Sequence, residues 1–274
     1  MIKFKPLFLI ALALIALLLG YKEQFFIMFL VVALHELSHI AVAYIFGLKC
    51  RSVTFTPLGF SAVIENLEYL SGSKKIYIML AGPILNLILW LVCEFIFVDR
   101  FIFFKQANMA IFLFNMLPVY PLDGGKICHI ILGNTIGVMN TNKILMRVGK
   151  VITKLMFVIG LVQVILFPFN ISLICLSVYL NKVSEKEYEN MTFEFYKTVV
   201  LNLNKVSMKK QLKLKSIVID KSNPMSVVID RLGWDNFHIV HVAEKNQILY
   251  TINEFEIIGH VTTKGLSCKF EELL

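Results

Sequence analysis

Long apolar segments constrain the fold of this chain more than any other feature of its sequence. Hydrophobic residues occupy 57% of the 274 positions and charged residues only 17%. A helix needs roughly 20 mainly apolar residues to cross a bilayer, and runs of this kind are typical of membrane proteins rather than soluble domains. We expect an α-helical polytopic membrane protein with six transmembrane helices, over residues 7–20, 25–48, 76–98, 107–117, 151–167 and 171–180, the last of which is the shortest.

Basic residues around these segments predict the orientation of the chain. If the N-terminus is cytoplasmic, nine lysines and arginines flank the spans on the cytoplasmic side and three lie outside, which agrees with the positive-inside rule. Both termini are therefore predicted to be cytoplasmic. The net charge of +8 follows from these flanks and a lysine-rich tail, which attract anionic lipid headgroups, and we do not expect nucleic-acid binding. The first apolar run has no small-residue cleavage site after it, so we expect a retained helix rather than a signal peptide.

The second apolar segment contains ionisable residues, which are costly in a membrane unless the protein uses them. They form the motif His35-Glu36-Leu37-Ser38-His39. On a helix, histidines four residues apart project from one face and can share a zinc ion, with Glu36 beside them as a base. The alternative is a pair of polar contacts between helices, but burying these three groups without a metal costs several kcal/mol. The motif predicts hydrolysis within the membrane and needs a third ligand from elsewhere.

A second polar element interrupts the fourth apolar segment. Residues 115–125 read Asn-Met-Leu-Pro-Val-Tyr-Pro-Leu-Asp-Gly-Gly, and two prolines so close together prevent a continuous helix. Non-helical backbone at membrane depth is tolerated only where it is buried in protein or lines a wet cavity. Such a segment would let Asp123 direct its carboxylate at the metal. Taken alone, the same residues are equally consistent with a turn where the chain leaves the membrane.

Taken together, three elements resemble the site-2 protease family of intramembrane zinc metalloproteases. They are the HExxH motif at 35–39, an A-G-P-x-x-N segment at 81–86 and an N-x-x-P-x-x-x-L-D-G pattern at 115–124. The order and spacing are most similar to the stage IV sporulation protein FB branch, with no inserted PDZ-like domain, and the resemblance covers residues 1–180. The resemblance implies Zn²⁺ as cofactor, with His35, His39 and Asp123 as its ligands and Glu36 as the catalytic base. It also implies that Asn115 and Pro121 shape the ligand-bearing loop and that Asn86 contacts the substrate backbone.

The composition changes after the last apolar segment, which predicts further parts of the chain. We expect a protease domain over 1–183, a linker with an amphipathic helix over 184–215, and a small cytosolic α/β domain over 216–274. In this last part strands are expected at 217–219, 237–242 and 247–252, with a helix opened by Asn223 and Pro224. Residues 237–259 resemble half of a CBS unit, but the domain is short for a complete pair of CBS repeats. Four other histidines are expected to be structural or surface residues: His129, His238, His241 and His260.

Residues 53–64 are rich in β-branched and aromatic side chains around a Pro-Leu-Gly turn, which predicts a β-hairpin or an extended loop. Such a hairpin is either an amphipathic surface loop or an edge beside the active site that pairs with an unwound substrate.

The function expected from these features is intramembrane cleavage of a membrane-associated protein in a bacterial cell membrane. By resemblance, the substrate is a transcription factor precursor or its regulator, cleaved by regulated intramembrane proteolysis in sporulation. Membrane regulatory proteins are further candidate partners, and the C-terminal domain is a candidate site for homo-oligomer formation. One alternative is a metal transporter or scaffold without hydrolytic activity, but a transporter needs no base beside its ligands and usually has related halves. Another is a membrane zincin for protein quality control, which normally uses a glutamate as third ligand.

Overall fold

The computed structural model describes residues 20–56, 59–65, 67, 70–96, 101–167, 170–201, 213–233, 236–245, 247–265 and 267–273. They belong to two compact units. The first comprises the chain up to Leu117 together with Leu122–Ile127, and the second comprises Pro118–Pro121 together with Cys128–Leu274.

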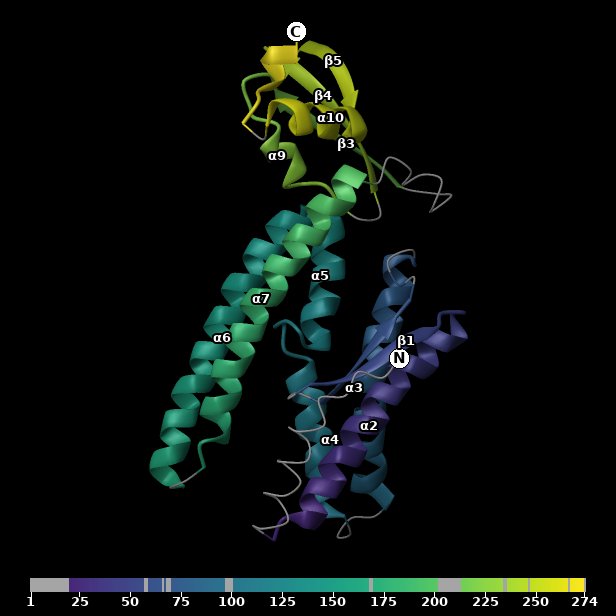
Figure 1. Cartoon of the computed structure of the whole chain (residues 1–274), viewed down its shortest axis with the longest axis vertical. Helices are drawn as coiled ribbons and strands as arrows, with labels where there is room; N and C mark the ends of the chain where they lie inside the picture. Colours follow the sequence, from purple (N-terminus) through teal and green to yellow (C-terminus); the bar gives the residue numbers. More distant parts are fainter. Residues whose placement is uncertain are drawn as a thin grey trace. The chain divides into compact units, whose positions relative to one another are not determined.

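Within the described residues, three helices and a β-hairpin form most of the first unit (Figure 1). The helices are α2 (Lys22–Ile45), α3 (Gly72–Ile96) and α4 (Ile102–Asn115), and each contacts the other two. Strands β1 (Cys50–Thr56) and β2 (Gly59–Ile64) pair antiparallel, and β2 lies against α2. The predicted hairpin is therefore confirmed, although its turn at 57–58 lies outside the described residues.

Within the described residues, three helices are long and apolar enough to cross a membrane: α2, α3 and α6 (Val138–Leu166). Many of their large apolar side chains face outward, including Phe29, Phe95 and Ile165. Such exposure would be unfavourable in water but suits contact with lipid. These three apolar helices support an integral membrane protein.

The other three predicted spans are not established. Residues 7–19 lie outside the described part of the chain, and the segment 107–117 falls largely in α4, which has 14 residues. A helix of that length is shorter than the roughly 20 residues needed for a crossing. The segment 171–180 forms the beginning of α7 (Ser172–Leu201), whose second half is charged. The count of six spans stays a prediction.

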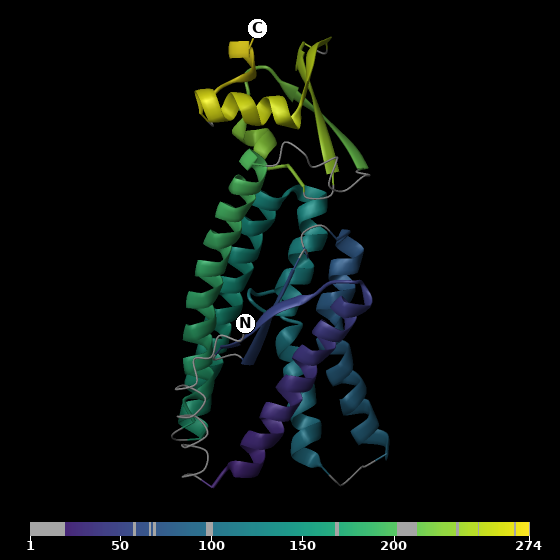
Figure 2. The same cartoon turned by 45° about the vertical axis from the view of Figure 1, so that its right-hand side comes forward.

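Helices α6 and α7 lie side by side along their lengths in the second unit, which also contains most of α5 (Asp123–Ile136) (Figure 2). Polar side chains link the two long helices, since Asn142 donates to the hydroxyl of Thr192 at 3.2 Å and the Thr153 hydroxyl lies 3.1 Å from the Asn181 side-chain oxygen. Helix α7 continues through residues 183 and 184, where the sequence predicted the border between the protease domain and its linker. The division into three domains stays a prediction.

The C-terminal part of the second unit is a small three-stranded sheet with helices. Its strand order is β3-β4-β5, with β3 (Lys213–Asp220) parallel to β4 (Asn236–Glu244) and β4 antiparallel to β5 (Gln247–Asn253). The predicted strands are confirmed, whereas the helix expected after Asn223 and Pro224 is only the single turn α9 (Ser226–Ile229). The remaining elements are α10 (Glu254–Lys264) and the 3-10 helix η2 (Phe270–Leu273). The resemblance to half of a CBS unit stays a prediction.

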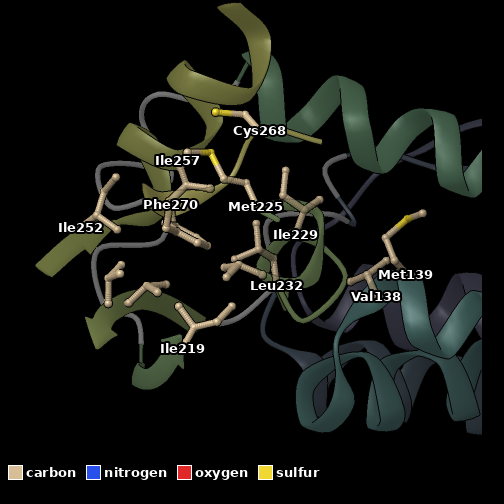
Figure 3. Close-up of a cluster of buried hydrophobic side chains, with 13 residues drawn as sticks. Val138, Met139, Ile219, Met225, Ile229, Leu232, Ile252, Ile257, Cys268 and Phe270 are labelled. Atoms are coloured by element: carbon tan, nitrogen blue, oxygen red, sulfur yellow. The ribbon is translucent and has the colours of Figure 1, made fainter. Parts of the chain in front are cut away.

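A buried apolar cluster joins this small domain to the start of α6 (Figure 3). Phe270 is its largest fully buried side chain, and Val138 and Met139 of α6 belong to the same cluster. The backbone N–H of Val138 donates to the Leu232 carbonyl at 3.0 Å, and Lys143 pairs with Asp230 at 2.7 Å. The small domain is therefore packed on residues 138–143 rather than tethered to them by a linker alone.

Gly137 makes this close packing feasible. Its φ of +93° is unfavourable for other residues, and a Cβ at this position would lie 2.4 Å from the Asp230 carbonyl oxygen. We expect Gly137→Ala to cost about 1–3 kcal/mol from the backbone conformation alone and to loosen the small domain from α6. Hydrogen exchange at residues 225–232 should increase, and the thermal unfolding temperature should fall.

Gly259→Ala is the matched control for this substitution. Gly259 lies in α10, where a Cβ would have no atom within 4 Å. Helix propensity then predicts unchanged exchange and a stability equal to or up to about 1 kcal/mol above wild type. Equal exchange in the Gly137→Ala variant and the wild type would contradict the packing of the small domain on α6.

Candidate metal centre

The histidines of the HELSH motif lie on one buried face of α2. His35 is 3% exposed and His39 is 6% exposed, and their ring centroids are 4.8 Å apart. Glu36 follows His35 directly and is half-buried. The hydroxyl of Ser38 donates to the His35 carbonyl at 2.6 Å, which satisfies this polar group within the helix. The motif thus presents two imidazoles together, as its spacing predicts.

The neighbouring helix α3 orients one of these imidazoles. The Nδ1 of His39 lies 2.6 Å from the backbone carbonyl oxygen of Ile78, to which it donates a hydrogen bond. Since a neutral imidazole carries one proton, this bond leaves the lone pair on Nε2. A carbonyl partner on the opposite ring nitrogen is the usual arrangement for a histidine that binds a metal.

Asp123 comes to the same place from a distant part of the sequence. Helix α4 ends at Asn115 and α5 begins at Asp123, so the helix break predicted for this segment is confirmed. The carboxylate is buried, with its Oδ2 3.1 Å from His35 Nε2 and 3.0 Å from His39 Nε2. Gly124 allows the start of α5 to approach the end of α4, because a Cβ there would lie 2.4 Å from the Met116 carbonyl oxygen.

These three atoms fit the geometry of a zinc site. The two imidazole Nε2 atoms are 3.2 Å apart, so the sides of the triangle they form with Oδ2 of Asp123 measure 3.0, 3.1 and 3.2 Å. Ligand atoms bound tetrahedrally to zinc at about 2.0–2.1 Å are about 3.3 Å from one another. Two imidazoles and a carboxylate are also a common catalytic donor set that leaves a fourth position open. Within the described part of the chain, His35, His39 and Asp123 are the one group that could hold a metal ion.

Two further residues around this site had no role assigned from the sequence, although Gly82 belongs to the A-G-P-x-x-N segment at 81–86. A Cβ on Gly82 of α3 would lie 2.4 Å from His39 Nε2 and 2.6 Å from His35 Nε2, so only glycine lets the α3 backbone pass beside both rings. Lys126 lies one turn after Asp123 on α5, with its Nζ 3.1 Å from Asp123 Oδ1. The three-residue spacing of Asp123 and Lys126 is a signal that could have identified this pair once the segment was known to be helical.

The residues predicted to shape the ligand-bearing loop or to contact the substrate have different surroundings. Asn86 lies one turn beyond Gly82 on α3 and is fully buried, and neither polar atom of its amide has a hydrogen-bond partner among the described residues. Asn115 donates to the Ile111 carbonyl on its own helix at 3.1 Å. Pro121 lies between α4 and α5, after a cis peptide bond. Their predicted roles stay predictions.

Two of the other histidines have structural partners in the small domain. His238 is fully buried, with its Nδ1 2.9 Å from the Glu254 carboxylate, and His241 lies 2.9 Å from the Thr251 hydroxyl. For these two, the expectation of a structural role is confirmed.

Comparisons with known proteins agree with this geometry. The sequence matches peptidase family M50 over residues 24–100 and 94–159. It is 24% identical to stage IV sporulation protein FB of Bacillus subtilis, over 97% of this chain and 94% of that protein. It is also 28% identical to a zinc metalloprotease of Methanocaldococcus jannaschii, over 60% of this chain but only 48% of that protein, so the chain spans about half the length of this archaeal relative.

A solved structure is similar as well. The site-2 protease from Methanocaldococcus jannaschii superposes with a TM-score of 0.53 at 27% sequence identity, covering 68% of this chain and 90% of that one. The similarity therefore extends to the fold.

The contact between Gly82 and the imidazoles gives a test of the metal site. In Gly82→Ala the new methyl group must displace both rings, so we expect zinc affinity to fall at least tenfold. The matched control is Gly149→Ala in α6, where the nearest atom to a Cβ is the Ser184 hydroxyl oxygen at 3.4 Å, an ordinary contact. Zinc per chain and a chelator titration measure the effect, and wild-type affinity in Gly82→Ala would contradict the described packing of α3 on the site.

Proposed function

Because the chain belongs to peptidase family M50, the site-2 protease family, we propose that it is an intramembrane zinc endopeptidase that cleaves a membrane-associated protein within or near the membrane. The observation that carries this proposal is the buried cluster of His35, His39 and Asp123 beside Glu36 on an apolar helix of membrane-spanning length. Three polar ligands are costly at such a position unless they bind a cation.

The chemistry follows from the residues around this cluster. A zinc ion held by the two histidines and Asp123 would supply Lewis acidity, which lowers the pKa of a water molecule and polarises a carbonyl group. Glu36 accepts a proton from the water whose oxygen forms a bond to the scissile carbonyl carbon. As the carbon–nitrogen bond breaks, Glu36 returns this proton to the leaving amine. One carboxylate thus serves as base and then as acid.

A membrane substrate must lose its helical structure before it can be cut, because its carbonyl groups are engaged in backbone hydrogen bonds. The hairpin of β1 and β2 is a two-stranded sheet, so each strand has one edge without a neighbouring strand in that sheet. An unwound substrate could add to such an edge by backbone hydrogen bonds. Asn86 supplies a further donor and acceptor, since its buried amide lacks partners among the described residues.

The finer features of the proposal rest on similarity and charge. Similarity to the stage IV sporulation protein FB of Bacillus subtilis supports a role in sporulation, and a transcription factor precursor or its regulator as substrate is what the resemblance of the motifs to that branch implies. The distribution of basic residues supports cytoplasmic termini, and the small C-terminal domain is a candidate site for homo-oligomer formation. We retain Asn115 and Pro121 as residues that shape the segment before Asp123, and we retain the three-part division at 183 and 215.

Substitution of Glu36 separates metal binding from hydrolysis. Glu36→Gln removes the base but none of the metal ligands, so we expect wild-type zinc content and cleavage slower by about 10²–10⁴-fold. Purified proteins in detergent would be compared on a panel of single-span substrates, including sporulation sigma-factor precursors. Asp123→Ala serves as the contrasting variant and should lose zinc. A cleavage rate of zinc-loaded Glu36→Gln close to that of the wild type would exclude Glu36 as the base, and zinc retention by Asp123→Ala would favour a zincin with another third ligand.

A substitution of Asn86 can distinguish a role in binding the substrate backbone from a role in helix packing. Leucine is similar in size to asparagine, and Asn86→Leu removes two buried polar atoms that lack partners among the described residues. Thermal stability should therefore rise. If the amide binds the substrate backbone, kcat/KM should nevertheless fall about tenfold, the effect of losing about 1.4 kcal/mol of hydrogen bonding. The control is Asn108→Leu in α4, whose amide donates to Phe104 on its own helix. An unchanged kcat/KM in Asn86→Leu would assign Asn86 to helix packing.

A further inference from the structure

The two carboxylate oxygens of Asp123 have different partners. Oδ2 faces both histidines, at 3.0 and 3.1 Å, whereas Oδ1 is 3.1 Å from the ammonium nitrogen of Lys126. Asp123 begins α5 and Lys126 lies in its first turn, so the two side chains are neighbours on one helix face. One oxygen is thereby directed to the ligand cluster and the other is occupied by a cation.

We propose that Lys126 is a positioning residue that presents Asp123 to the metal through a single oxygen. This inference rests on the zinc site of the proposed function. An aspartate near a cation can bind through one oxygen or both, and a bidentate carboxylate would occupy an additional coordination position. With Oδ1 held by the Lys126 ammonium, only Oδ2 is available. The remaining position stays open for the water that the reaction consumes.

Burial distinguishes this ion pair from the other lysine–carboxylate pairs at the protein surface. The Asp123 side chain is 6% exposed, whereas the Lys126 side chain is 40% exposed. The carboxylate therefore cannot replace the lost partner with bulk water, while the lysine keeps part of its hydration. By contrast, both side chains of the Lys150–Glu185 pair are more than 40% exposed, and exposed pairs contribute little to stability.

Removal of the ammonium should weaken metal binding itself. Groups that hold a metal ligand in place typically account for a 10–100-fold difference in metal affinity. Without Lys126, Asp123 loses the constraint on its orientation and the counterion of its second oxygen. A lysine that instead contacted the substrate would influence cleavage and leave metal affinity unchanged.

The test compares four variants with the wild type in the absence of substrate. Lys126→Met removes the charge and the hydrogen bond, Lys126→Gln keeps a donor without the charge, Lys126→Arg keeps both, and Lys150→Met removes a lysine from an exposed pair. Chelator competition gives the zinc affinity, and the visible spectrum of the Co²⁺-substituted proteins reports the number of ligands around the metal. Thermal unfolding identifies any variant that does not fold.

We expect Lys126→Met to bind zinc about 10–100-fold more weakly, with a Co²⁺ spectrum shifted toward a higher coordination number. Lys126→Arg and Lys150→Met should resemble the wild type, and an intermediate result for Lys126→Gln would separate the charge from the hydrogen bond. Wild-type zinc affinity and an unchanged spectrum in folded Lys126→Met and Lys126→Gln would overturn the proposal. A wild type that binds no zinc would refute the metal site and this inference with it, whereas a zinc-bound wild type that cleaves no substrate would contradict only the protease activity.

Discussion

The approach of one carboxylate to two imidazoles inside an apolar helical environment governs the structure of the first unit. Oδ2 of Asp123 lies 3.0–3.1 Å from the Nε2 atoms of His35 and His39, and such a group of polar atoms is costly away from water unless each atom has a partner. The surrounding features serve this contact. Gly82 lets α3 pass beside the rings and the Ile78 carbonyl orients one of them.

The chain reaches this arrangement by interrupting its helical structure between α4 and α5. Between Asn115 and Asp123 the helical structure ends and restarts, and Gly124 allows the new helix to begin close to the old one. A helix start is also a favourable place for a carboxylate, since the backbone N–H groups there carry partial positive charge. Asp123 thus combines a position at the start of α5 with contacts to both imidazoles and to Lys126.

Much of this architecture was predictable because it depends on local patterns. Apolar length identified α2, α3 and the second half of α6, and β-branched and aromatic residues around a turn indicated the hairpin. All three strands of the small domain were predicted, β4 and β5 close to their observed bounds and β3 as a shorter strand. The failures have physical causes. The short apolar segment 171–180 does not reveal that the helix continues through a charged segment to Leu201, because α7 lies against α6 along its length. Nor does a local pattern reveal that Val138 and Met139 belong to the core of the small domain.

For the metal site, the sequence by itself determined the residue types and their spacing along one helix. Histidines four residues apart must share a face of α2, and two prolines before Asp123 must interrupt a helix, whatever the rest of the chain does. Only the tertiary structure decided that Asp123, 84 residues after His39, meets those histidines, that Gly82 lies against them and that Lys126 holds the second oxygen. Contacts across such distances depend on how helices pack, and packing is a property of whole surfaces rather than of any short segment of sequence.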